Sequence, residues 1–321
     1  MNGPTPLRIA MLGASKIAPH ALIAPARTNA RIVVHGVAAR DRERANAYAR
    51  EHDVPQVFAD YETLLASPDI DAVYNSLPPS RHADLTIAAL KAGKHVLCEK
   101  PFAMNTAEAL AMVQAAQANG RVLMEAFHYR FHPMFTAILQ TARERLGALT
   151  HIEAAFCVPI AQKPGELRYD PALGGGALMD LGTYCVHWCR TIAGREPKVI
   201  GASQRKTEGG ADLASDAELD FGGGLRATIA CAMDSGPRAE LIVHSEAGSL
   251  TALNPLAPQM GHLLTLKTPD GEEIFTFTRD ATYDFQLNAF VDAVQHGAPA
   301  LTGGDDAIAQ MRLIDAIKTA A

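Results

Sequence analysis

Residues 7–18 read LRIAMLGASKIA: a short apolar run, a glycine, and the start of a helical pattern. The run is mostly apolar, which predicts a buried strand of a parallel sheet. Gly13 and Ala18 fit the first and third positions of the Gly-x-Gly-x-x-Gly/Ala dinucleotide fingerprint, whereas Ser15 replaces the middle glycine. The order strand, turn, helix favours phosphate binding at the helix N-terminus over a plain tight turn. The predicted cofactor contacts in this turn are Gly13, Ser15, Lys16 and Ile17.

The alternation of strand and helix continues outward from this stretch. Further strands are predicted at 31–38, 70–76, 95–98 and 121–126, and helices at 41–51, 61–66, 80–91 and 106–118. Strands separated by helices of this length imply right-handed crossovers and a parallel, doubly wound α/β sheet. We therefore predict a dinucleotide-binding Rossmann domain over residues 1–128.

After residue 130 the apolar residues alternate with a period of two. Strand patterns occur at 150–158, 217–221, 225–231, 240–244, 262–267 and 273–278, separated by glycine-rich or proline-rich turns. Helices are predicted at 131–145, 177–192, 284–294 and 305–318. The pattern predicts an α+β domain over residues 129–321 with a large open, mostly antiparallel sheet.

Composition narrows the class of protein. The 321 residues exceed what one core usually supports, so two domains are expected. A net charge of −6 argues against nucleic acid and an anionic membrane surface as partners. The five cysteines form no disulfide framework and no Cys-x-x-Cys pair, so we expect no metal site and a reducing, cytoplasmic location. No signal-peptide pattern opens the chain, and no apolar run reaches the length of a membrane span.

The end of the second predicted strand bears on the choice of cofactor. NAD-binding folds usually place an acidic residue there for the ribose hydroxyls, whereas this strand ends Val37-Ala38-Ala39-Arg40. The Arg40 guanidinium suits a 2′-phosphate, which predicts NADP as the preferred cofactor and NAD as the other candidate. The alternative is a surface arginine beside Asp41, which is expected to cap the next helix.

Two loops at the carboxyl ends of later strands add candidates. Residues 75–82 read NSLPPSRH, a stiff loop that is either a cofactor wall or a rigid crossover. Its predicted cofactor contacts are Ser76, Leu77, Pro78 and His82. In the next loop Pro101 restricts Lys100 and is a candidate for a cis bond. Lys100 is predicted to bind the substrate oxygen and the cofactor, and Glu99 to bind the cofactor; a surface Glu-Lys pair is the alternative.

Residues 124–133 read MEAFHYRFHP and lie where the pattern changes, near the expected junction of the domains. Arg130 is a candidate cofactor or substrate contact, and a plain surface role fits it equally. His128 and His132 are four residues apart, but the following Pro133 and the missing glutamate of His-Glu-x-x-His argue against zinc.

Gly174–Gly176 opens the helix predicted at 177–192. Asp180 and Tyr184 are four residues apart, so they are expected to share one helix face. A tyrosine hydroxyl beside a carboxylate and a lysine can exchange a proton, so we predict Asp180 and Tyr184 as catalytic together with Lys100. Taken alone, this helix favours the simpler interpretation that Tyr184 is a core tyrosine and Asp180 its partner.

Together these stretches resemble the glucose–fructose oxidoreductase, inositol dehydrogenase and rhizopine-catabolism (Gfo/Idh/MocA) family, especially its dihydrodiol, xylose and glucose–fructose oxidoreductase branch. The resemblance rests on the order of Gly13–Ala18, Ala38–Asp41, Glu99-Lys100-Pro101, Glu125–Pro133, Gly174–Tyr184, Asn254–His262 and Thr282–Ala293. It implies a Rossmann domain followed by a domain whose large open sheet often mediates oligomerisation, hence a homodimer or homotetramer. It also implies that Lys100 is the active-site lysine and that Tyr184 replaces the catalytic histidine of many members.

We therefore expect an oxidoreductase that transfers a hydride between a nicotinamide cofactor and a small polyhydroxylated substrate, namely a sugar, polyol or diol. Tyr184 is expected to exchange the hydroxyl proton, Lys100 to polarise the oxygen and Asp180 to orient the site. Two alternatives are a non-catalytic nucleotide sensor of the same fold and a transferase or lyase that uses a tightly held cofactor. Substrate specificity is expected around Glu166–Tyr169, His187 and Met233–Pro237.

Overall fold

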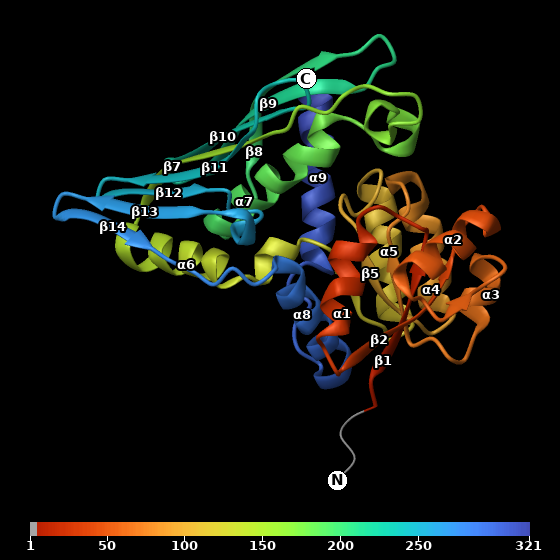
Figure 1. The fold of residues 1–321 in the computed structure, drawn as a ribbon. Coiled ribbons are helices and arrows are strands. Elements are labelled where there is room, and N and C mark those ends of the chain that lie inside the picture. The colour runs from red at the N-terminus through yellow and green to blue at the C-terminus, as the bar shows by residue number, and fades with distance from the viewer. Residues whose placement is uncertain (1–4) are drawn as a thin grey trace. The chain divides into compact units, whose positions relative to one another are not determined.

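The computed structural model describes residues 5–321, and its contacts divide the chain into two compact units (Figure 1). The first unit comprises the described residues up to Phe127 together with Tyr283–Ile308. The second comprises His128–Thr282 and Ala309–Ala321. No helix within residues 5–321 combines the length and the hydropathy needed to cross a bilayer.

The first unit is built on a six-stranded sheet in the order β3-β2-β1-β4-β5-β6, in which every neighbouring pair is parallel. The strands are β1 (Leu7–Leu12), β2 (Ile32–Ala38), β3 (Gln56–Val57), β4 (Ala72–Asn75), β5 (His95–Cys98) and β6 (Leu123–Glu125). The predicted parallel, doubly wound sheet is therefore confirmed. Because β2 and β4 flank β1, the strand order reverses at the carboxyl end of β1, where open α/β sheets bind ligands.

Helices connect these strands, and a side chain of Asp41, Asp60 or Asn105 accepts a hydrogen bond that caps the start of three of them. The helices are α1 (Ala24–Arg27), α2 (Arg42–His52), α3 (Tyr61–Ala66), α4 (His82–Lys91) and α5 (Thr106–Ala118). Nearly all of α8 (Thr282–His296) also belongs to this unit, whereas most of α9 (Asp305–Ala320) belongs to the second. The expected cap of α2 is present, because the Asp41 carboxylate accepts a hydrogen bond from the Arg44 backbone N–H. The helix expected from about Ser15 begins later, as a π-helical turn at Pro19–Ile23 that leads into α1.

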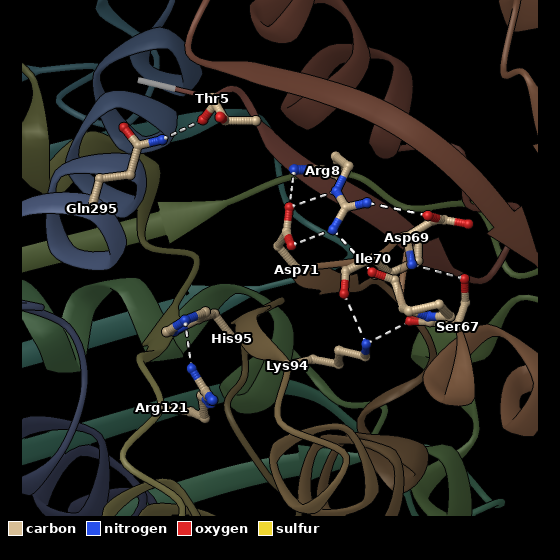
Figure 2. Close-up of polar contacts among 11 residues, drawn as sticks. Thr5, Arg8, Ser67, Asp69, Ile70, Asp71, Lys94, His95, Arg121 and Gln295 are labelled. Carbon is tan, nitrogen blue, oxygen red and sulfur yellow. Dashed lines mark hydrogen bonds and ion pairs between the residues drawn. The ribbon is translucent and has the colours of Figure 1, made fainter. Parts of the chain in front are cut away.

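An ion-pair network fastens the amino ends of the strands of the first unit (Figure 2). The Arg8 guanidinium donates to both carboxylate oxygens of Asp71, at 3.0 and 2.8 Å, and reaches Asp69 at 3.3 Å. The Lys94 ammonium donates to the carbonyl oxygens of Ser67 and Ile70, at 2.6 and 2.8 Å. These bonds join the amino ends of β1, β4 and β5. The opposite, carboxyl end of β1 leads into Gly13–Ala18, which we call the glycine turn.

The second unit contains an eight-stranded sheet in the order β14-β13-β12-β11-β7-β10-β9-β8. The strands are β7 (Leu149–Cys157), β8 (Lys198–Lys206), β9 (Asp212–Gly222), β10 (Leu225–Ala232), β11 (Arg238–Ser245), β12 (Gly248–Leu253), β13 (Leu263–Thr268) and β14 (Gly271–Phe275). All pairs are antiparallel except β7 with β10, so the predicted open, mostly antiparallel sheet is confirmed. The edge strand β8 and the strand β12 were not predicted.

Helices pack on one face of this sheet. Helix α7 (Thr183–Ala193) contacts β7 and β10, and α6 (Pro133–Thr141) contacts β12. Side chains on that face, such as Ile152 and Leu241, are buried, whereas the alternate residues His151 and Glu153 are half-buried. We call the second face, which carries His151 and Glu153, the outer face.

Candidate active site

The glycine turn at the end of β1 has no room for a side chain at its first position. Gly13 adopts a φ of +99°, and its backbone N–H donates to the Ala38 carbonyl at 2.8 Å. A Cβ added to Gly13 would lie 2.9 Å from the Leu77 side chain. The Ser15 hydroxyl accepts a hydrogen bond from the Ala18 backbone N–H at 3.3 Å, so it caps the turn. Lys16 and Ile17 complete the turn before Pro19.

Two side chains of α2 brace this turn, and sequence reasoning did not single them out. Arg44 donates to the Ala14 carbonyl at 2.8 Å, and the Tyr48 hydroxyl donates to the Ser15 carbonyl at 2.9 Å. Burial raises the pKa of Tyr48 to about 12, so its hydroxyl stays protonated and remains a donor. They lie four apart on one helix face, but their partners become visible only once the fold is known.

Arginines gather at the carboxyl end of β2. Burial raises the pKa of the Tyr61 hydroxyl, while the backbone of Arg40 and the charges of nearby guanidinium groups oppose that shift. The guanidinium groups close enough to act on Tyr61 belong to Arg40, Arg44 and Arg81. Because Arg81 pairs with Asp84 at 2.8 Å and Arg44 braces the glycine turn, Arg40 is the member suited to hold a free anion.

His82 joins the loop after β4 to the loop after β5. Its ring is fully buried; Nδ1 lies 2.9 Å from the Pro101 carbonyl oxygen and Nε2 lies 2.8 Å from that of Leu77. Burial lowers the pKa of His82, although both carbonyls oppose the shift. His82 thus holds two loops together, and its predicted contact with the cofactor stays a prediction.

The predicted contacts Ser76, Leu77 and Pro78 lie between β4 and the 3₁₀ turn Pro79–Arg81. The Ser76 hydroxyl points to the Leu12 carbonyl at 3.4 Å, which places this loop beside the end of β1. The predicted contacts around Gly13 and Leu77 are therefore brought together by the fold.

The loop after β5 is fixed on the side of Glu99. The buried Tyr74 hydroxyl donates to Glu99 Oε1 at 2.5 Å, and the Lys100 backbone N–H donates to Glu99 Oε2 at 3.2 Å. The peptide bond between Lys100 and Pro101 is cis. Lys100 itself is half-buried and follows the carboxyl end of a parallel strand, as expected.

In the second unit, Tyr184 stands in the first turn of α7 and is only 5% exposed. Its ring packs edge-on against the rings of Phe156 and His128, with centroids 5.6 and 6.3 Å away. Behind it, the Tyr129 hydroxyl makes a short hydrogen bond with His187 Nδ1. Tyr184 is therefore held by an aromatic cluster that fixes its ring.

Asp180 lies in a π-helical turn at Leu178–Gly182, so the predicted regular helix at 177–192 is correct only from Thr183 onward. Its carboxylate accepts a hydrogen bond from Arg168 Nε at 2.6 Å. Arg168 was noted in the sequence only within the segment expected to set specificity. The partner emerges from a loop, which no spacing rule could pair with Asp180.

Gly174–Gly176, which we call the glycine run, precede this π-helical turn, and close packing requires glycine at two of the three positions. A Cβ added to Gly175 would lie 2.5 Å from the Leu167 carbonyl oxygen, and one added to Gly176 would collide with the Asp212 carboxylate. Asp212 accepts a hydrogen bond from the Leu178 backbone N–H at 2.7 Å, and burial raises its pKa. Asp212 therefore caps the segment that carries Asp180, a role that no sequence signal had marked.

The histidines near the start of the second unit have structural partners. His128 Nδ1 lies 2.7 Å from the Thr282 hydroxyl, and His132 Nδ1 accepts from the Met134 backbone N–H at the start of α6. Arg130 lies over the Phe135 ring, 5.6 Å from its centroid, and its predicted ligand contact stays a prediction. Within residues 5–321 no group of three or more histidine, cysteine or acidic side chains is placed to hold a metal ion.

The chain is similar to known proteins over most of its length. A model of the Gfo/Idh/MocA oxidoreductase family, NAD-binding Rossmann fold, matches residues 7–127, and a model of the Gfo/Idh/MocA C-terminal domain matches residues 139–251. The chain is 33% identical over 284 residues to D-xylose 1-dehydrogenase (NADP(+)) 2 of Haloferax volcanii, which covers 88% of this chain and 87% of that protein. It is 36% identical over 224 residues to trans-1,2-dihydrobenzene-1,2-diol dehydrogenase of Sus scrofa, covering 69% of this chain and 66% of that protein.

Among solved structures, the 3-ketoreductase KijD10 from Actinomadura kijaniata, in complex with NADP and TDP-benzene, is similar with a TM-score of 0.92. The two chains are 26% identical, and the match covers 98% of each.

Proposed function

The chain belongs to the Gfo/Idh/MocA oxidoreductase family, and we propose that it is an NADP-dependent dehydrogenase or reductase of a sugar, polyol or diol. The observation that carries this proposal is Lys100, which follows the carboxyl end of β5 in a loop fastened by Tyr74 and His82. An ammonium group held at the carboxyl end of the parallel strands is suited to donate a hydrogen bond to a substrate oxygen. The two dehydrogenases to which the chain is similar carry xylose and dihydrobenzenediol in their names.

The first unit fits a nicotinamide dinucleotide phosphate. Gly13 leaves the turn without a side chain, so the backbone of the turn is accessible for a pyrophosphate to approach closely. Arg40 supplies a cation where NAD-specific folds place a carboxylate, which supports a 2′-phosphate there. NADP, when bound, supplies the nicotinamide that accepts or gives up the hydride.

The residues of this chain would perform the proton transfer. Lys100 would donate a hydrogen bond to the reacting oxygen, and Tyr184 would take up or return its proton. The Asp180 carboxylate would accept a hydrogen bond from a substrate hydroxyl and so orient the carbinol carbon. Lys100 belongs to the first unit and the other two residues to the second, so their meeting over one substrate is part of the proposal.

The proposal is tested with Lys100→Ala and Tyr184→Phe, assayed by NADPH absorbance against aldopentoses, aldohexoses, inositols and aromatic diols. We expect turnover to fall at least about 100-fold in each variant, as for lost general acid–base catalysis. NADPH binding, followed by nicotinamide fluorescence, should change less than about threefold, since neither side chain is assigned to the phosphates. Unchanged turnover in both variants would remove the mechanism, and no turnover by the wild-type protein would favour a nucleotide sensor.

We also propose that two copies associate through the outer face of the eight-stranded sheet. That face holds a hollow of about 420 Å³, whose floor includes the small residues Ala155, Gly201 and Ala230 and whose lining also includes the charged residues Glu153, Asp216, Glu218 and Arg238. Leu253 and Leu263 pair across β12 and β13 and are 39% and 38% exposed. Apolar side chains beside a hollow are typical of a surface that a partner covers.

A further inference from the structure

The segment that carries Asp180 and Tyr184 does not begin as a regular helix. Asp180 lies in the π-helical turn Leu178–Gly182, and Tyr184 lies in the first turn of α7, which follows directly. Hydrogen bonds in a π-helix span five residues rather than four, so a π-helical turn is wider than an α-helical one. The offset between the two side chains around the helix axis therefore depends on what keeps this turn in its wide form.

Asp212 holds the beginning of the π-helical turn from a neighbouring strand. It is the first residue of β9 and is 8% exposed, and its Oδ2 accepts a hydrogen bond from the Leu178 backbone N–H at 2.7 Å. Ala177, which precedes the turn, has no polar group in its side chain to act as a cap. Gly176 gives the carboxylate room, because its φ is +122° and an added Cβ would lie 2.0 Å from Asp212 Oδ1. The cap is thus supplied from a distant part of the chain.

The other end of the turn is fixed by a close contact with β10. A Cβ added to Gly182 would lie 2.8 Å from Cys231 Sγ and 2.9 Å from Leu178 Cδ1. The φ of Gly182 is −62°, an ordinary helical value, so lack of space is what requires glycine here. Cys231 is 2% exposed, and its Sγ donates to the Ser215 carbonyl oxygen of β9 at 3.4 Å. Because β9 and β10 pair with each other, one surface holds both ends of the turn (Figure 1).

The packing beneath the turn reaches Tyr184. Ala177, Leu181 and Cys231 belong to one buried cluster, and Phe156 packs against it. The Phe156 ring also lies edge-on to the Tyr184 ring, with centroids 5.6 Å apart. A displacement of the turn would therefore be transmitted to the phenol ring through side chains as well as through the backbone.

We propose that Asp212 is a positioning residue for catalysis, which keeps this turn in its π-helical form and so sets the places of Asp180 and Tyr184. This inference rests on the proposed function, because it takes those two side chains to act on the substrate. It extends that function by adding a residue of β9 that acts through the backbone of the turn and contacts neither substrate nor cofactor.

The charge of Asp212 suits this role. Burial raises the pKa of Asp212, while the hydrogen bond from Leu178 and the charges of Lys318 and Lys206 oppose that shift. A carboxylate that accepts from a backbone N–H forms a shorter and stronger bond than a neutral acceptor does. Asparagine keeps an acceptor without the charge, so it should hold the turn less firmly than aspartate and more firmly than alanine.

The proposal is tested with Asp212→Ala and Asp212→Asn in single-turnover reactions, which follow nicotinamide absorbance with the best substrate among the sugars and diols. The amplitude measures the fraction of active protein, and the rate constant measures how well the reacting groups are placed. For Asp212→Ala we expect the rate constant to fall about 10- to 100-fold, because small displacements of reacting groups slow a reaction strongly. The amplitude and the NADPH affinity should be retained, and Asp212→Asn should recover part of the rate constant.

Asp220→Ala is the matched control on the same strand. Asp220 Oδ1 accepts a hydrogen bond from the Gly222 backbone N–H at 2.8 Å in an exposed turn, so this variant removes the same kind of bond away from the π-helical turn. Its rate constant should equal that of the wild type. A control as slow as Asp212→Ala would overturn the proposal, since any change on β9 would then slow the reaction.

A purely structural role of Asp212 gives a different result. The amplitude and the melting temperature of Asp212→Ala would fall while the rate constant kept its wild-type value, which would overturn the positioning role. An Asp212→Asn protein as slow as Asp212→Ala would overturn it as well, because the accepted hydrogen bond would then not be what holds the turn.

If Asp212→Ala does not fold, Asp212→Asn and a size exchange between Gly182 and Cys231 carry the test. Gly182→Ala places a methyl group against Cys231 Sγ and should slow hydride transfer about 10-fold or more, by lifting the turn off β10. Adding Cys231→Ala removes the sulfur and should restore part of the rate constant, because substitutions at positions in contact are coupled. A double variant as slow as Gly182→Ala would show that the place of the turn does not set the rate, against the proposal.

Failure of this inference is distinguishable from failure of the proposed function. Absence of turnover by the wild-type protein would contradict the proposed function, and the role of Asp212 would fail with it. Equal rate constants in the wild type and in all the variants would overturn only the role of Asp212 and leave the oxidoreductase function intact.

Discussion

The hydroxyl of Tyr74 on β4 donates a hydrogen bond to the carboxylate of Glu99 at 2.5 Å, from a ring that is fully buried. Glu99 is the residue before Lys100, so a core side chain fixes the first residue of the loop after β5, which we call the lysine loop. A fixed carboxylate at this position can hold its orientation while a ligand binds.

Tyr74→Phe should therefore weaken the site with little effect on the fold. It removes one hydrogen bond to a charged group, worth about 1.5–3 kcal/mol. We expect NADPH affinity or kcat to fall about 10-fold or more, measured by fluorescence titration and steady-state kinetics. Thr319→Val is the control, because it removes a hydroxyl that donates to a backbone carbonyl in α9 instead. If Tyr74→Phe leaves both quantities unchanged, Glu99 has no functional link to Tyr74.

His82→Leu should disturb the lysine loop from behind. A neutral imidazole has one N–H, so the substitution leaves one carbonyl oxygen, of Pro101 or of Leu77, without its donor, which costs about 1–3 kcal/mol. We expect a lower melting temperature and a kcat reduced more strongly than NADPH affinity, because Lys100 loses its support. His82→Gln, which can still donate to one carbonyl, should lie between Leu and the wild type. An equal loss in NADPH affinity would favour direct contact between His82 and the cofactor.

Arg40→Ala should change the choice between the two nicotinamide cofactors. A guanidinium–phosphate contact is worth about 1.5–3 kcal/mol, so the NADPH dissociation constant should rise about 10- to 100-fold. The value for NADH, which lacks the phosphate, should change less than about threefold on the same grounds. Arg50→Ala, at the exposed far end of α2, is the control. Equal effects of Arg40→Ala on both cofactors would contradict the assignment.

His95 at the start of β5 predicts a pH dependence of stability. Burial lowers its pKa to about 4, and its Nδ1 accepts a hydrogen bond from the Val122 backbone N–H at 3.0 Å. A free histidine has a pKa of about 6.5, so between those values the unfolded chain binds a proton that the folded chain does not. The contribution is thus present above about pH 6.5 and is lost as the pH falls toward 4.

His95→Asn keeps an acceptor near Nδ1 and removes the titration. We expect the free energy of unfolding, measured with urea, to fall less steeply from pH 6.5 to 4.5 in the variant than in the wild type. A slope identical in the two proteins would show that His95 titrates normally.

Leu263→Glu on the outer face should separate a dimer into monomers. The side chain is 38% exposed and faces away from the core, so the fold should be retained while a buried charge opposes association. Sedimentation velocity measures the mass, and Val33→Glu, at an exposed site on β2, is the control. A wild-type protein that sediments as a monomer would remove the proposal.

The sequence predicted both sheets because their patterns are local: β1 is mostly apolar and β11 alternates. It missed the two-residue strand β3, the strand β12 and the edge strand β8, which contains no fully buried residue. It also missed the late start at Pro19 and the π-helical turn before Tyr184, since tertiary contacts decide how a helix begins. The grouping of Tyr283–Ile308 with the first unit likewise depends on contacts across the whole chain.

For the candidate site, the sequence identified residues whose neighbours along the chain are distinctive, such as Gly13 and Lys100. It missed Tyr74, Asp212 and the bracing pair of Arg44 and Tyr48. These residues act through partners far along the chain or through backbone carbonyls, and neither leaves a mark in spacing. Spacing placed Tyr184 on the same helix face as Asp180, but it gave no sign of the hydrogen bond that Arg168 donates to the Asp180 carboxylate.

The Arg8–Asp71 pair and Lys94 lie at one end of the parallel strands, and Gly13, Arg40 and Lys100 lie at the other. The ion pairs and hydrogen bonds that stabilise the sheet are thus separated from the candidate ligand site. Stability effects of substitutions at such well-separated positions usually add. Evolution or an engineer can therefore exchange residues at the ligand-facing rim without loosening the far end. A substitution near Arg8 that increases the free energy of unfolding could therefore offset a destabilising substitution at Arg40.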